Sequence, residues 1–328
     1  MKKTSAPAPG LALCLLAGCT GQSSEGVDTR PGATEIDADN ALIVATATMT
    51  ALASAGDIAA VDDLLGRLAD RAAGSIDTAA SLRPARAPGS PDKLAMNPCR
   101  AGGFNGSVSL GQPHLLRLEQ RLAPGDYFSL DFSDCRLTAE LSLSGGLDLQ
   151  VDRFVGALNG GDVEYLYTAM FRNLRVDAAP ANYVANGDMQ MFFGSTSFPL
   201  VFAALSGQHL TIESGRSSAT LRDYDLASEG VLLRKPDVYG SINTIFDGFL
   251  ASTEFAGEIR FQTQTPFRTD GQPRAIPSQG QILIVGAGNA VLRLTVTGEA
   301  VQLELDANGN GSFEHRDSAS WATLTGGV

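Results

Sequence analysis

The sequence predicts a mainly all-β protein: a long antiparallel meander that curls into an open or closed barrel-like sheet, preceded by a short helical hairpin. From about residue 102 onward, apolar and polar side chains alternate, as in Phe128, Leu130 and Phe132 with serine and aspartate between them. This period of two is typical of antiparallel strands with one face on a core and the other in water. Because twisted open sheets rarely exceed about ten strands, a meander of this length is expected to curl.

The same alternation predicts further strands at 164–171, 188–193, 209–213, 219–224, 257–263, 280–285, 290–297 and 300–305. Several of them open with a glycine that turns the chain and a polar residue that leads in, at Gly161, Gly187, Gly257 and Gly280. The apolar runs 197–205 and 242–250 fit either short helices or buried strands, and both interpretations stay open.

The segment 36–74 has a helical period instead. Apolar residues recur at helical spacing on both sides of Gly56, which interrupts the pattern, with Asp57 as the N-cap that follows and Gly74 as the stop. The segment is therefore expected to form two short helices that pair as a hairpin and cover the core.

Two irregular segments flank this hairpin. Residues 19–35 are rich in Gly, Ser and Thr without an apolar period, which predicts a flexible tether. Residues 75–98 are rich in proline, which predicts a linker, and residues 99–328 then form the β domain.

The N-terminus carries an export signal. Lys2 and Lys3 precede a short apolar run, residues 11–17, that leads through small residues to a cysteine. The run is too short to span a bilayer, which takes about 20 residues. Residues 1–18 are therefore predicted to be a signal peptide.

Leu16-Ala17-Gly18-Cys19 resembles the lipobox of bacterial lipoproteins, with leucine at the third position before the cysteine and small residues at the two nearest. The resemblance implies that the Cys19 thiol receives a diacylglyceryl group, that the preceding peptide is removed and that the new amino terminus is acylated. Thr20 stands where the family's inner-membrane retention signal has Asp, which implies the outer membrane. Acyl chains contribute about 0.8 kcal/mol per buried methylene, so more than one gives a stable anchor. The alternative is an ordinary cleaved signal with an incidental cysteine.

The β domain resembles uncharacterised proteobacterial envelope lipoproteins in its Cys99-Arg-Ala-Gly-Gly start and its Phe132-Ser-Asp-Cys135 strand end. That resemblance implies an all-β fold and an envelope location, and no activity. Cys14 lies in the signal peptide that is removed and Cys19 is lipidated, so Cys99 and Cys135 remain as a pair. In an oxidising periplasm this pair predicts one disulfide worth roughly 3–4 kcal/mol. Two buried free thiols are the competing interpretation.

Charge and motifs limit the function classes. The formal net charge of −12 repels phosphate backbones, which argues against a nucleic-acid partner. Three scattered histidines leave little material for a zinc site or a histidine triad, and the sequence has no Gly-x-Ser-x-Gly elbow, no His-Glu-x-x-His and no phosphate loop. No catalytic residue is assigned. Paired acids such as Asp148 and Asp152 are the material for a glycosidase-like alternative, although solvated strand faces explain them more simply.

One loop near the C-terminus is a candidate calcium site. Oxygen-bearing residues recur at loop positions 1, 3, 5, 9 and 12, with glycine at 6, which matches EF-hand-like loops. The candidate ligands are Asp306, Asn308, Asn310, Ser312, Glu314 and Asp317. The loop departs from the strict pattern because two ligands are Asn, the twelfth is Asp and a strand precedes it, so any affinity is expected at roughly 0.1–1 mM. A plain hairpin turn at one of the Asn-Gly pairs is the competing interpretation.

These features predict an envelope lipoprotein that is held to the outer membrane by its lipids and has a non-catalytic β domain for structural support or for binding a protein, polymer or lipid. The alternative is an envelope hydrolase with paired carboxylates. An apolar cavity in the curled sheet would favour lipid binding. Two carboxylates about 5–10 Å apart in a cleft would favour the glycosidase, and a filled core with neither would favour a structural role.

Overall fold

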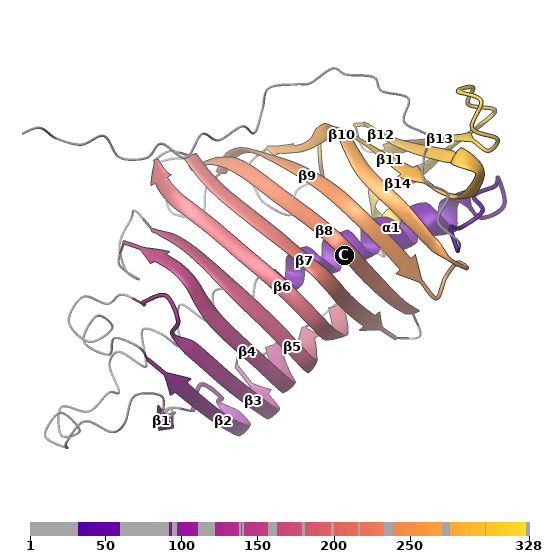
Figure 1. The fold of residues 1–328 in the computed structure, drawn as a ribbon. Helices are drawn as coiled ribbons and strands as arrows, with labels where there is room; N and C mark the ends of the chain where they lie inside the picture. The colour runs from indigo at the N-terminus through magenta and orange to yellow at the C-terminus, as the bar shows by residue number, and fades with distance from the viewer. Residues whose placement is uncertain are drawn as a thin grey trace, which may run out of the picture.

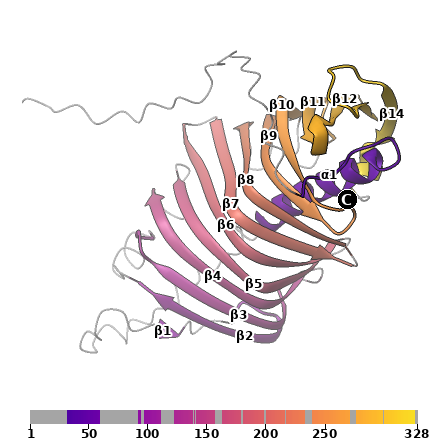
Figure 2. The ribbon, with the colours of Figure 1, turned by 45° about the vertical axis from the view of Figure 1, so that its right-hand side comes forward.

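The computed structural model describes residues 32–59, 92–93, 97–110, 122–137, 139, 141–156, 163–178, 181–197, 200–215, 217–232, 239–270, 276–298 and 300–325. They form one antiparallel sheet in which each strand pairs with its neighbours in sequence, from β1 to β14 (Figure 1). The sheet is curved and open, since the described edge strands β1 and β14 do not pair with each other (Figure 2). The predicted all-β meander is confirmed, and of its two forms the open one is present.

The strands are β1 (Asp92–Lys93), β2 (Ala101–Ser109), β3 (Tyr127–Arg136), β4 (Leu141–Val155), β5 (Glu164–Ala178), β6 (Ala181–Ser197), β7 (Leu200–Ser214), β8 (Ser217–Leu232), β9 (Tyr239–Ser252), β10 (Glu258–Asp270), β11 (Gln279–Val285), β12 (Val291–Thr297), β13 (Ala300–Asp306) and β14 (His315–Ser320). The helices are α1 (Ala41–Ala59), the 3-10 helix η2 (Ala287–Asn289) and α4 (Trp321–Leu324). Strand β7 contains most of the apolar run 197–205, and β9 contains the run 242–250. Both runs fitted either helices or strands in the sequence, and the strand interpretation holds for both.

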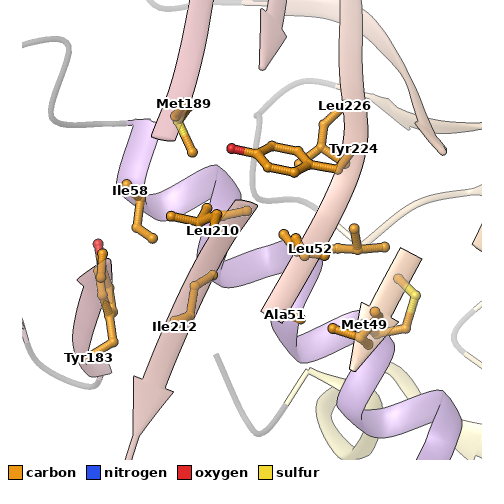
Figure 3. Packing of buried hydrophobic residues seen from close by; sticks show 14 of the residues in the cluster. Met49, Ala51, Leu52, Ile58, Tyr183, Met189, Leu210, Ile212, Tyr224 and Leu226 are labelled. Atoms are coloured by element: carbon orange, nitrogen blue, oxygen red, sulfur yellow. The ribbon is translucent and has the colours of Figure 1, made fainter. Parts of the chain in front are cut away.

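Alternation along the strands gives the sheet an inner face, defined here as the face on which α1 lies. Leu130, Leu147 and Phe171 stand opposite one another on β3, β4 and β5 of this face, and none is more than 3% exposed. Farther along the sheet, α1 contacts β7, β8, β9 and β12. Figure 3 shows side chains of α1, among them Leu52 and Ile58, packed against the inner face of the sheet.

Helix α1 runs without interruption through Gly56, so the predicted break between two helices at this residue is wrong. Glycine inside a helix costs about 1 kcal/mol relative to alanine. Leu52, Ala55 and Ile58 nevertheless hold this part of the helix on the sheet, with exposed fractions of 3%, 0% and 0%. Burial of such side chains contributes roughly 1.5–3 kcal/mol each for the larger ones, which outweighs the cost of the glycine. The rest of the predicted hairpin, 60–74, lies outside the described residues.

The predicted tether 19–35 is wrong at its C-terminal end, because residues from 32 onward join the fold. The Thr34 N–H donates to the Glu258 carbonyl oxygen at 3.0 Å, and the Glu258 N–H donates to the Gly32 carbonyl oxygen at 2.9 Å. Thr34 is only 2% exposed. The chain is therefore fixed to the turn between β9 and β10 before it reaches α1. The rest of the predicted tether, 19–31, lies outside the described residues.

A line of β-bulges bends the sheet. Asp134 in β3 and Asn173 in β5 both have a φ of 49°, and the pairing register shifts at each of them. Glycine occupies the facing positions because a Cβ at Gly102 would lie 2.0 Å from the Asp134 carbonyl oxygen, and one at Gly145 would lie 2.0 Å from that of Asn173. Bulges bend a strand and increase its twist. Their repetition across neighbouring strands explains the curvature of the sheet.

The two ends of the β domain are fastened differently. A disulfide joins Cys99, ahead of β2, to Cys135 in β3, with the Cα atoms 5.1 Å apart, which confirms the predicted pair. At the other end, Trp321 is 8% exposed and stacks on Phe267 with ring centroids 6.1 Å apart. Across the described ranges, no helix is both long and apolar enough to cross a membrane.

Candidate functional site

A groove of about 440 Å³ lies between α1 and the ends of β7, β8 and β9. Its helix wall consists of α1 side chains between Leu42 and Ser54, and its sheet wall includes Ile212 of β7 and Ala219 of β8. Thr323 of α4 also borders it. The volume falls within the range of about 300–1,000 Å³ that is usual for ligand pockets. An apolar cavity is the feature that would favour lipid binding. Among the described residues, this groove fits that expectation best.

The helix wall is uncharged surface that the sheet does not cover, and Thr46, Thr50 and Ser54 add hydroxyl groups to its aliphatic side chains. No charged residue occurs between Ala41 and Gly56, and a helix without a polar face is usually buried on all sides. Val44 and Ala45 are fully buried on the side of the sheet, but Leu42 and Ile43 are 39% and 44% exposed. Both exposed side chains line the groove. One flank of α1 thus stabilises the core, and the other leaves aliphatic surface in contact with water.

The sheet wall has a polar rim, defined as Ser214, Ser217, Ser218, Ser252 and Glu254. The Ser217 hydroxyl donates a short hydrogen bond to Glu254 Oε1, which links the start of β8 to the turn after β9. The Glu254 N–H donates to Ser252 Oγ at 3.2 Å within that turn. The groove is therefore amphipathic, with Leu42 and Ile43 as its exposed apolar part on the helix and hydroxyl and carboxylate groups along the rim of the sheet.

The paired acids of the hydrolase alternative lie elsewhere. Asp148 accepts hydrogen bonds from Ser129 Oγ at 2.6 Å and from Arg172 Nε at 2.9 Å. Asp152 accepts from Thr168 Oγ1 at 2.5 Å and from Gln150 at 3.1 Å. Neither carboxylate belongs to the lining of the groove. Each is held by its own donors on strands β3 to β5, as expected for acids that stabilise the solvated face of a sheet.

The candidate calcium loop forms a compact turn around one buried carboxylate. Asp306 is 3% exposed, and its Oδ1 and Oδ2 accept the N–H groups of Asn310 at 3.1 Å and Gly311 at 2.7 Å. Asn308 Nδ2 and Asn310 Nδ2 both donate to Glu314 Oε1, at 3.0 and 3.3 Å. The structure therefore brings four of the six predicted ligands together, in a network that satisfies the turn without an ion.

The other two predicted ligands contribute less to this loop. Ser312 donates its N–H to Asn310 Oδ1 at 2.7 Å, while Asp317 lies in β14 opposite Leu303 and accepts from the Ser318 N–H. Among the described residues, no group of three or more His, Cys, Asp or Glu side chains is arranged to hold a metal ion. The predicted turn is present, and calcium binding stays a prediction.

Sequence reasoning did not identify the groove, because its walls come from α1, β7 to β9 and α4, which are far apart along the chain. One signal was available. The uncharged run from Ala41 to Gly56 is too apolar to be the solvent-facing side of a surface helix, which marks it as a helix with a second partner surface. Cys19, the predicted lipid attachment site, lies outside the described residues.

Fold and groove together define an open antiparallel β-meander with a helix-lined apolar groove. No protein-family model, curated protein or solved structure matches this chain. The groove and the signals in the sequence are therefore the features from which a function can be inferred.

Proposed function

We propose that this chain is a bacterial envelope lipoprotein, anchored in the outer membrane through lipids on Cys19, whose β domain binds an apolar chain without catalysis. The single observation that carries the binding role is the groove beside α1, where Leu42 and Ile43 are exposed although the helix has no charged residue around them. An acyl chain is the ligand chemistry that this wall favours, since each buried methylene contributes about 0.8 kcal/mol.

The polar rim supports the same ligand class. Ser218 and Ser252 place hydroxyl groups at the sheet side of the groove, where the ester end of an acyl lipid finds hydrogen-bond donors. The glycosidase alternative has no comparable support, because Asp148 and Asp152 are held by other side chains outside the groove. No residue is proposed as catalytic.

Native mass spectrometry of the protein extracted from its own membrane tests the binding role. We expect one non-covalent lipid or fatty acid per chain in addition to the covalent anchor. Ile43→Gln should lose it, because the substitution places an amide on the helix wall. Ile276→Gln is the matched control, since Ile276 is 55% exposed and does not line the groove. A wild-type protein that carries only its covalent acyl mass would contradict the proposal.

The anchor needs a separate test. Cells labelled with radioactive palmitate should incorporate label into the wild-type protein, and the protein should sediment with the outer membrane. Cys19→Ala should abolish both the label and the sedimentation, because no other attachment is proposed. Label on the Cys19→Ala protein would show that the lipobox interpretation is wrong.

A further inference from the structure

We propose that the groove takes its acyl chain from the membrane in which the protein is anchored, because the chain that follows the anchor joins the fold beside the turn that carries Glu254 of the polar rim and then begins the helix wall. This inference rests on the proposed lipid anchor and on the proposed binding of an apolar chain. It adds the source of the ligand, which is a membrane lipid within reach of the anchor.

The sheet wall of the groove is fixed to the end of the tether. Ala33 forms a bridge to Glu258 at the start of β10, and Thr34 Oγ1 donates to the Ala256 carbonyl oxygen at 2.8 Å. Gly257 must be glycine here, because it has a φ of 92° and a Cβ would lie 2.3 Å from the Gly32 carbonyl oxygen. The turn that holds the entering chain is therefore the same turn that carries Glu254 of the polar rim.

The helix wall begins only a few residues later. Asp37 Oδ1 accepts the N–H of Asn40 at 3.0 Å and turns the chain into α1, whose first turn contains the exposed Leu42 and Ile43. In Figure 1 the start of α1, in indigo, lies at the end of the sheet formed by the C-terminal strands. Residues 32–40 thus connect the polar rim to the most exposed apolar part of the groove, so both features lie close to the point where the tether enters.

The length of the tether limits how far the groove can lie from the membrane. About 13 residues separate Cys19 from Gly32, and a fully extended chain of that length spans at most about 45 Å. This is about the thickness of one bilayer with its headgroups. Tethering a site so close to the membrane raises the effective concentration of membrane lipid at that site. Because lipid covers the whole membrane plane, only the height of the site above that plane matters, and this height grows roughly as the square root of tether length.

The experiment uses the full lipidated chain in vesicles of phosphatidylethanolamine and phosphatidylglycerol that contain a phospholipid with a diazirine on one acyl chain. Irradiation should label peptides of α1 and of the ends of β7 to β9. Inserting about 39 Gly and Ser residues after Thr20 makes the tether about four times longer and roughly doubles the mean height of the site above the membrane, so labelling should fall about twofold. Ile43→Gln should reduce labelling about tenfold with either tether, and Ile276→Gln should not.

A second measurement separates the source of the ligand from the binding itself. The fluorescent fatty acid cis-parinaric acid, added from solution, should bind equally well to the short-tether and long-tether proteins. Membrane labelling that is the same for both tethers, with parinaric acid bound, would overturn the inference and leave the proposed function intact. Failure of both proteins to bind parinaric acid would instead contradict the proposed function.

The protein's own anchor is the competing occupant. A diazirine leucine analogue in place of Leu42 should cross-link to vesicle phospholipid when the lipidated protein is irradiated in unlabelled vesicles. A cross-link from this position to the lipopeptide of Cys19 alone would also overturn the inference, because it would show that the groove holds the chain's own acyl group.

Discussion

The hydroxyl of Tyr224 in β8 donates a 2.9 Å hydrogen bond to the backbone carbonyl oxygen of Asp188 in β6, two strands away. The bond crosses Gly207 of β7, where a Cβ would lie 2.6 Å from the Tyr224 hydroxyl oxygen. Tyr224 is 2% exposed, and its burial raises the pKa of the phenol so that the hydroxyl stays protonated. The Asp188 carboxylate in turn accepts the N–H groups of Gln208 and His209 in β7. The pairing register between β6 and β7 shifts here, so these bonds and the Tyr224 bond together stabilise one β-bulge.

Tyr224→Phe should lower the free energy of unfolding by about 1–3 kcal/mol, because it leaves the half-buried Asp188 carbonyl without this donor. Gly207→Ala should lower it by a similar amount through overpacking, since the obstructing atoms include the Asp188 backbone oxygen at 2.7 Å, which cannot rotate away. Urea denaturation of both variants measures these changes. Wild-type stability in Tyr224→Phe would show that the hydrogen bond does not hold the bulge.

Gly56→Ala should raise the free energy of unfolding by about 0.5–1 kcal/mol, because Gly56 lies inside a continuous helix and has open space where the methyl group would go. Urea denaturation gives the stability, and far-ultraviolet circular dichroism gives the helix content. Gly207→Ala is the opposite control, since the same methyl group meets backbone there. A loss of stability in Gly56→Ala would favour the interrupted hairpin that the sequence predicted.

The β-bulges show why the sequence predicted the strands but not their full extent. In β5 the inward residues are odd-numbered up to Phe171 and even-numbered from Leu174, because Asn173 adds a residue at a bulge. A period of two therefore ends at 171, although the strand continues to Ala178. A similar bulge splits β7 between Ser206 and Leu210, so the sequence predicted a strand at 209–213 and left the run 197–205 open between helix and strand.

The groove was less predictable for a different reason. Its helix wall is local, so the uncharged run that begins at Ala41 could mark α1 as unusual. Its sheet wall depends on which strand ends meet the helix, and that follows from the curvature set by the bulges and from the hydrogen bonds of Thr34 near Glu258. Long-range pairing of this kind has no periodic signal in the sequence.

Asp225→Asn should stabilise the protein near neutral pH. Asp225 in β8 stands directly opposite Asp247 in β9, and burial followed by the negative charge of Asp247 raises the pKa of the Asp225 carboxyl. A raised pKa means that the folded protein holds this proton more tightly than the unfolded chain does. The stability that the carboxyl contributes is therefore present in acid and is lost as the pH rises through its folded-state pKa.

We expect Asp225→Asn to exceed the wild type by about 0.2–1 kcal/mol near neutral pH, the range for a like-charge pair across two strands. The advantage should shrink as the pH falls through the raised folded-state pKa of Asp225 and should vanish below the ordinary pKa of a carboxyl group, as measured by urea denaturation over a pH series. Asp131→Asn is the matched control: Asp131 pairs with Arg172 at 3.0 Å, so its loss should bring no stabilisation. An advantage of Asp225→Asn that persists unchanged in acid would show that charge is not its cause.

Asp306→Ala should lower the free energy of unfolding by about 1–3 kcal/mol in the absence of calcium, because the buried carboxylate accepts the N–H groups of Asn310 and Gly311. Glu314→Ala should have a smaller effect, since Glu314 is exposed and accepts only side-chain amides. Thermal unfolding with and without several millimolar calcium then separates the two interpretations of the loop. A wild-type melting temperature that rises with calcium and does not rise in Asp306→Ala would establish the ion site, whereas equal curves for the wild type would leave the loop as a turn closed by its own carboxylate.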